Sequence, residues 1–184
     1  GSGGDACSQS FLFSAVPSVG SGTWTQESGP GVTVFNNDNS PNATGTVNVY
    51  GTYVYRWTEL NGVCSDFAEV TVNYYAPPTA SITLGGGDVC GLSQNVTAVL
   101  STGTGGTWSQ VSGPGTVTFG VATALSTTAT ADAYGTYVVR WTEENNVCSD
   151  FDEVTINYYE SPVSDAGSGG DACSQSFLFS AVPS

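Results

Sequence analysis

The feature that most constrains this chain is internal repetition. Residues 167–184 have the same sequence as residues 1–18, GSGGDACSQSFLFSAVPS, an offset of 166 positions. Within that period, residues 50–75 return with few changes as residues 134–159, an offset of 84 positions. Repeats at a fixed period determine architecture more strongly than other sequence signals. We therefore expect two similar units, the opening of a third, and a parent array that continues in both directions.

The repeat divides the chain into residues 1–76, residues 77–160, and a final segment, 161–184, that holds a linker and the first strand of a truncated third unit. Each full unit has the size of a small all-β domain. Short alternating segments, separated by turn clusters such as Gly29-Pro30-Gly31, are typical of a β-sandwich or barrel. In the first unit we expect strands near Gln9–Val16, Thr23–Glu27, Val32–Phe35, Thr44–Val49, Thr52–Glu59 and Asp66–Tyr74. In the second we expect Ser81–Leu84, Gln94–Leu100, Thr107–Gln110, Thr116–Phe119, Thr127–Ala131, Thr136–Glu143 and Asp150–Tyr158.

Alternation along these strands assigns the core and the solvent face. Tyr53, Tyr55 and Trp57 share the inward face of one strand, and Arg56 falls on the outward face. The four tryptophans are the expected structural core: Trp24, Trp57, Trp108 and Trp141. The outward face holds the only two cations of the chain, Arg56 and Arg140.

A hairpin about Asn61-Gly62 would place Arg56 opposite Glu69, and the matching hairpin would place Arg140 opposite Glu153. Each pair would be a surface salt bridge, which stabilises a fold by at most about 1 kcal/mol.

Two proline-containing segments join the units, Tyr75-Ala-Pro-Pro-Thr79 and Tyr159-Glu-Ser-Pro-Val163. Proline fixes φ, so these joints should be stiff and extended. A glycine-rich stretch follows each, at Gly85–Gly87 and Gly167–Gly170. These glycines would either loosen the joint or let the backbone pack closely against the preceding unit.

Composition excludes several functions. The chain has 16 acidic and two basic residues, for a net charge of −14, which argues against binding nucleic acid or an anionic membrane surface. No apolar run approaches the about 20 residues of a membrane-spanning helix, so we expect no membrane insertion. Without His or Lys the chain cannot build a Ser-His-Asp triad or supply the usual general bases, so we expect no enzyme.

The five cysteines fall into two classes related by the repeat. Cys7, Cys90 and Cys173 follow Gly-Gly-Asp-x, whereas Cys64 and Cys148 lie in Val-Cys-Ser-Asp-Phe. One pairing joins Cys7 to Cys64 and Cys90 to Cys148 within each unit, and leaves Cys173 for a partner beyond the chain. The other joins Cys64 to Cys90 and Cys148 to Cys173. We favour the first, which closes a long loop in each small sandwich. Either pairing implies an oxidising, extracellular compartment.

Metal binding is the alternative reading of the cysteines and acids. Zinc is disfavoured because there is no His and no C-x-x-C spacing. Calcium at the joints would use carboxylates such as Asp88, Asp165 and Asp171 near the linkers, or Asp66 and Asp150 after the second class of cysteine. No calcium-binding loop pattern appears, and we interpret these acids as solvated; we expect no cofactor.

Three segments resemble known repeats: Tyr-Gly-Thr-Tyr-x-x-Arg-Trp-Thr-Glu, Asn-x-Val-Cys-Ser-Asp and Glu-Val-Thr-(Val/Ile)-Asn-Tyr. Together with Gly-Thr-Trp…Ser-Gly-Pro-Gly, they are similar to the Ig-like and PKD-like tandem repeats of giant Bacteroidota surface or filament proteins. The PKD Trp-Asp-Phe-Gly-Asp motif is absent, and Gly22-Thr-Trp-Thr-Gln stands in its place, so Ig-like is the better description. The resemblance implies seven-stranded sandwiches, secretion, and no catalytic residues.

These observations predict a structural repeat of a long extracellular fibre, stalk or adhesin filament, whose partners are further copies of the same repeat. The alternative is a glycan- or protein-binding adhesion module, with Tyr-, Thr- and Asn-rich outer faces as the contact surface.

Overall fold

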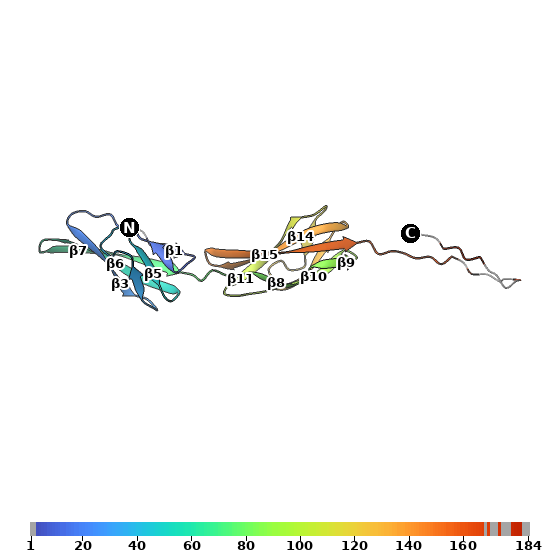
Figure 1. Cartoon of the computed structure of the whole chain (residues 1–184), viewed down its shortest axis with the longest axis horizontal. Helices are drawn as coiled ribbons and strands as arrows, with labels where there is room; N and C mark the ends of the chain where they lie inside the picture. Colours follow the sequence, from blue (N-terminus) through green and yellow to red (C-terminus); the bar gives the residue numbers. More distant parts are fainter. Residues whose placement is uncertain (1–2, 168, 170–172, 174–177, 182–184) are drawn as a thin grey trace.

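The computed structural model describes residues 3–167, 169, 173 and 178–181. Two all-β units follow one another along the long axis of the molecule, and the chain leaves the second unit along the same axis (Figure 1). The described residues contain no helix that is long and apolar enough to cross a membrane.

Unit 1 is a sandwich of two sheets. One sheet has the strand order β1-β7-β6-β3, and the other has the order β2-β5-β4. Its strands are β1 (Gly4–Ala6), β2 (Ser10–Leu12), β3 (Ser21–Ser28), β4 (Thr33–Phe35), β5 (Thr44–Val47), β6 (Gly51–Asn61) and β7 (Cys64–Tyr74). Strand β1 pairs in parallel with the end of β7, whereas the other neighbouring strands are antiparallel.

Unit 2 repeats this plan with one additional edge strand. Its sheets have the orders β9-β15-β14-β11 and β8-β10-β13-β12. Its strands are β8 (Ser81–Leu84), β9 (Gly87–Cys90), β10 (Ser93–Val99), β11 (Gly105–Ser112), β12 (Val117–Phe119), β13 (Ser126–Ala131), β14 (Gly135–Asn145) and β15 (Cys148–Tyr159). Strand β8 pairs with β10, and no strand in the described part of unit 1 occupies the corresponding position.

The long hairpins β6–β7 and β14–β15 form the centre of each unit. Tyr53 pairs with Val72 and Tyr55 with Val70, so that alternate residues of both strands enter the core. The buried phenol of Tyr53 also donates a 2.7 Å hydrogen bond to the carbonyl oxygen of Val49, which closes the turn before β6. Such a tyrosine is characteristic of Ig-like sandwiches.

Tryptophan pairs lie at the centre of both cores. Trp24 and Trp57 have ring centroids 5.3 Å apart, and Trp108 and Trp141 repeat that spacing. All four are buried, as are most of the inward-facing tyrosines. Aromatic side chains bury large apolar areas, which suits sandwiches of this size.

The all-β, Ig-like fold agrees with the sequence-based prediction, but β1 and β9 were not expected. Both are short and follow glycines, and both pair in parallel with the last strand of their unit. A Cβ atom on Gly86 would lie 2.6 Å from Cγ2 of Val154, so this stretch packs closely against the sheet. Of the expected first strand of a third unit, Gln175–Val182, residues 175–177 and 182 lie outside the described residues, and residues 178–181 are not in a strand.

Candidate functional site: the joint between the units

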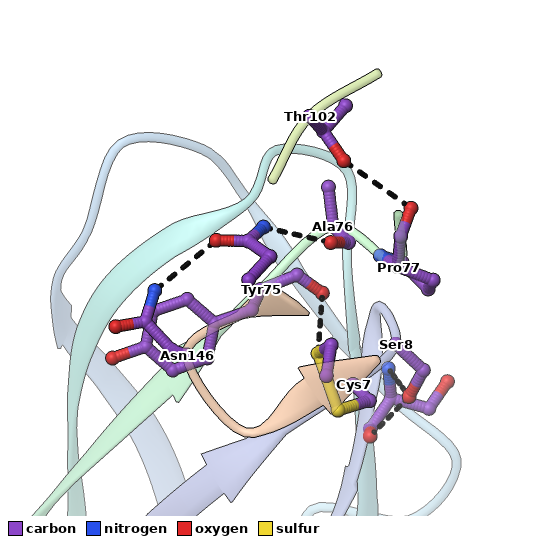
Figure 2. The surroundings of a disulfide bond; sticks show 10 residues. Cys7, Ser8, Tyr75, Ala76, Pro77, Thr102 and Asn146 are labelled. Carbon is purple, nitrogen blue, oxygen red and sulfur yellow. Dashed lines mark hydrogen bonds between the residues drawn. A yellow bond between two sulfur atoms is a disulfide. The ribbon is translucent and has the colours of Figure 1, made fainter. Parts of the chain in front are cut away.

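The joint is held by a disulfide between Cys7 of unit 1 and Cys148 of unit 2, whose Cα atoms are 5.3 Å apart (Figure 2). Cys7 directly follows β1, and Cys148 begins β15. The bond therefore links the end of the edge strand β1 of unit 1 to the first residue of β15, the second strand of the long hairpin in unit 2.

This disulfide corrects both pairings considered from the sequence. Strand β1 pairs Ala6 with Tyr74, the last residue of β7, whereas Cys64 is the first residue of that strand. Ten residues of extended chain span roughly 33 Å, and a disulfide requires Cα atoms within about 7 Å. Cys7 and Cys64 thus lie at opposite ends of unit 1. The same geometry separates Cys90, which pairs beside Tyr159, from Cys148.

The alternative pairing of Cys64 with Cys90 is also wrong, because Cys64 lies at the outer end of unit 1 and Cys90 at the far end of unit 2, and neither carries a disulfide. Cys64, Cys90 and Cys173 carry no disulfide and are exposed. The pairing of Cys148 with Cys173 is replaced by its bond to Cys7.

The linker is bonded to both units at its start. The Tyr75 N–H donates to the carbonyl oxygen of Ala6 at 2.8 Å, which extends the β1–β7 pairing by one residue. The next carbonyl, that of Ala76, accepts a 2.8 Å hydrogen bond from Nδ2 of Asn145 in unit 2 (Figure 2). Sγ of Cys148 lies 3.9 Å from the Tyr75 carbonyl oxygen. Unit 1 therefore binds Tyr75, and unit 2 binds the next residue, Ala76.

Two carboxylates of unit 2 bind the rest of the linker. Oδ2 of Asp150 accepts the Ala80 N–H at 3.0 Å, and Oδ2 of Asp152 accepts the Ile82 N–H at 2.8 Å. These bonds place β8 at the edge of the sheet next to β10. Charge-assisted bonds of this kind are stronger than bonds between neutral groups. Asp150, considered as a calcium ligand from the sequence, here binds backbone.

A buried glutamate shapes the loop on which the linker rests. Glu143 is fully buried, and its Oε1 accepts the N–H groups of Ser101, Thr102 and Gly103 at 2.8, 3.2 and 2.7 Å. Burial favours the protonated form, but the hydrogen bonds from Gly103, Ser101 and Thr102 together outweigh it. The pKa of Glu143 is therefore lowered, and the residue is a carboxylate at neutral pH.

Both arginines lie where the sequence pattern placed them. Arg56 Nη2 lies 2.6 Å from Oε1 of Glu69, and Arg140 Nη2 lies 2.5 Å from Oε1 of Glu153. Arg56 also lies 3.0 Å from Glu27, a partner that the sequence did not indicate. Each guanidinium stacks over a phenylalanine as well, Phe67 or Phe151, at 4.3 and 4.0 Å from the ring centroid. These contacts stabilise the outward face of the sheet.

The described acids that were considered for calcium do not come together. Asp88 accepts a hydrogen bond from Asn157 at 2.8 Å, and Asp165 accepts the Gly167 N–H at 2.8 Å. Asp171 lies outside the described residues. Among the residues described, no group of three or more acids or cysteines is arranged to hold a metal ion.

Comparison with known proteins supports the fold. No family model and no curated protein matches the chain. Among solved structures, extracellular domains 3–5 of Drosophila OTK match with a TM-score of 0.51 and 12% identity, over 84% of this chain and 57% of that one. An I-band fragment of titin matches with a TM-score of 0.44 and 13% identity, over 88% and 64%. The fibronectin type III-like modules of Clostridium thermocellum CbhA match at 0.43 and 15%, over 86% and 90%.

The chain thus spans less than two thirds of the OTK and titin chains. The OTK likeness shows an Ig-like fold in tandem and nothing about activity.

Proposed function

We propose that the chain is a segment of a long extracellular fibre or stalk, in which Ig-like units joined end to end act as a stiff mechanical spacer. The observation that carries the proposal is the disulfide between Cys7 and Cys148, which crosslinks successive units rather than the interior of either one. A crosslink across a joint adds little to the core of a unit, but it fixes the direction in which the next unit points.

The linker supports the same role. Hydrogen bonds from both units hold consecutive residues of an extended, proline-containing segment, which leaves little freedom for bending. A disulfide of this kind persists in an oxidising compartment, which is consistent with secretion. The net charge of −14 keeps such chains soluble and repels neighbours.

The test compares the distribution of distances between spin labels placed on the two units. In the oxidised protein we expect one narrow distribution. Cys148→Ser should broaden it, because the crosslink is lost while both cores remain. Cys64→Ser is the matched control, because this cysteine carries no disulfide, and it should leave the distribution narrow. A broad distribution in the unaltered oxidised protein would contradict the spacer role, and tight glycan binding by a single unit would favour the adhesion module instead.

A further inference from the structure

The two units differ at the end that faces the preceding segment of the chain. In unit 2 this end is covered by residues 75–84, which cross the loop 101–103 and then pair as β8 with β10. Ala80 and Ile82 pack against the core there. In the described part of unit 1 no strand covers the corresponding end.

The open end of unit 1 contains a cavity of about 230 Å³. Its apolar wall includes both tryptophans of the unit 1 core, together with Ala15, Phe67, Ala68 and Val70. Ala15 and Val16 correspond to Ala98 and Val99, which in unit 2 pair with β8. Val16 is 81% exposed, whereas Val99 is 45% exposed. The cavity and the open sheet edge therefore lie where unit 2 receives its additional strand.

Most of the polar groups that bind the linker and β8 in unit 2 recur in unit 1; Asp152 is the exception, because Ala68 stands at its position. Glu59, Asn61, Cys64 and Asp66 stand at the positions of Glu143, Asn145, Cys148 and Asp150 and line this cavity and an adjoining one. In the described part of the chain no linker segment lies against these side chains of unit 1. Asn61, Cys64 and Asp66 are exposed.

One hydrogen bond distinguishes the open end from the covered end. In unit 1 the Trp57 indole N–H donates to Oε1 of Glu59 at 3.0 Å. In unit 2 the corresponding Nε1 of Trp141 is buried with no hydrogen-bond partner among the described residues, and Glu143 accepts three amides of the loop, where Glu59 accepts that of Ser18. The carboxylate therefore has two arrangements at equivalent positions, one under a bound linker and one without it.

We infer that the open end of unit 1 is the docking site for residues 159–166 of a preceding copy of this repeat pair, and that Cys90 of that copy then bonds to Cys64. The inference rests on the proposed function. It specifies a second joint, between unit 2 of one copy and unit 1 of the next. Residues 159–166 are the fitting occupant because they precede a sequence identical to residues 1–18, as a linker in an array would. Tyr159 and Pro162 correspond to Tyr75 and Pro78 of the joint that the structure shows.

The position of Cys90 supports this pairing. Strand β9 runs parallel to the end of β15 and places Cys90 beside Tyr159. In unit 1 the same parallel pairing carries Cys7 to the side of Tyr75, from where it reaches Cys148. At the second joint Cys90 would therefore take the position that Cys7 has at the joint between units 1 and 2. The two thiols would form the bond by exchange with a small disulfide such as oxidised glutathione, which is reduced to two thiols as the cysteines lose two protons and two electrons.

The test uses a protein in which residues 19–184 are repeated directly after Ser184, so that the second joint is present in one chain. After oxidation with glutathione, non-reduced peptides are mapped by mass spectrometry. Cys64 of the first copy and Cys90 of the second, which have no partner in this protein, are replaced by Ser, so that the remaining Cys64 and Cys90 peptides each have one origin. We expect Cys90 of the first copy bonded to Cys64 of the second. Finding this Cys90 free, or bonded elsewhere, overturns the inference. Detection of the Cys7–Cys148 bond in the same map keeps this result separate from the proposed spacer role.

A second measurement does not depend on the crosslink. Hydrogen exchange of residues 13–16 is compared between the two copies of unit 1 in the same reduced protein, so that identical sequences report an open and an occupied docking site. We expect slower exchange in the second copy, because an added strand pairs with this edge. Equal exchange in the two copies overturns the docking site.

Discussion

The hydroxyl oxygen of Ser101 accepts the backbone N–H of Thr79 at 2.7 Å. That same hydroxyl donates to Oε1 of Glu143 at 3.0 Å. A linker peptide group is thus connected through one side chain to a buried carboxylate of unit 2, and the ionisation of Glu143 is linked to how firmly the linker is held.

Glu143→Gln should destabilise unit 2 at neutral pH by roughly 2–3 kcal/mol, because hydrogen bonds to a charged acceptor are lost. The pKa of Glu143 is lowered in the folded state, so the stabilisation is complete above the ordinary Glu pKa of about 4.3. It is lost as the pH falls from there through the folded-state pKa, because the unfolded chain takes up the proton first. Thermal unfolding between pH 7 and pH 2 measures both effects.

The matched variant is Glu59→Gln. Hydrogen bonds from the Ser18 hydroxyl, the Trp57 indole and the Ser18 backbone lower the pKa of Glu59 to about 2, but this side chain is only partly buried, whereas Glu143 is fully buried. Its replacement should lower the melting temperature at pH 7 by less than Glu143→Gln does. If the melting temperature of Glu143→Gln falls between pH 7 and pH 2 in the same way as that of the unaltered protein, the role of the carboxylate is contradicted.

Gly113→Ala should destabilise unit 2 by roughly 2–4 kcal/mol. Gly113 has φ +155°, and an added Cβ would overlap the ring of Tyr137, which is fully buried and cannot withdraw. Chemical denaturation gives the change in free energy of unfolding. Gly62→Ala is the control: Gly62 has φ +63° with open space around the site, so only the backbone cost of about 1 kcal/mol should appear. Equal costs for the two variants would show that the ring contact is unimportant.

Removal of the Arg140–Glu153 ion pair should lower the free energy of unfolding only slightly. A double-mutant cycle with Arg140→Met and Glu153→Gln should give a coupling energy of about 0.5–1 kcal/mol that shrinks with added salt, because both side chains are about one third exposed. The cation–π contact with Phe151 adds a similar amount to the cost of Arg140→Met alone. A coupling above 2 kcal/mol, or one insensitive to salt, would disagree with this view.

The sequence predicted the hairpins well because alternation and turn residues act locally. The turn at Gly62-Val63, next to the Asn61-Gly62 pair that the sequence indicated, determines the register of β6 and β7, and that register places Arg56 beside Glu69. The buried tryptophans follow from the same alternation.

The cysteine pairing was not predictable in this way, because it depends on the direction of β1. This strand is three residues long, glycine-rich, and pairs with residues far away in sequence. One signal was present: Asp5 and Asp88 precede the equivalent cysteines, and each accepts a 2.8 Å hydrogen bond, from Asn73 and Asn157 respectively. These repeated Asp and Asn residues fix both short strands at the far end of the hairpin.

The parallel pairing of β1 with β7 determines how a pulling force crosses the molecule. Load on β7 is shared with β1 through hydrogen bonds that are sheared together, and it passes from Cys7 through the disulfide directly into β15. Strand β15 shares load in the same way with β9, which ends at Cys90. Tension therefore has a route along one sheet of each unit that bypasses the peptide linker, so the linker can set the angle of the joint without being its weakest element.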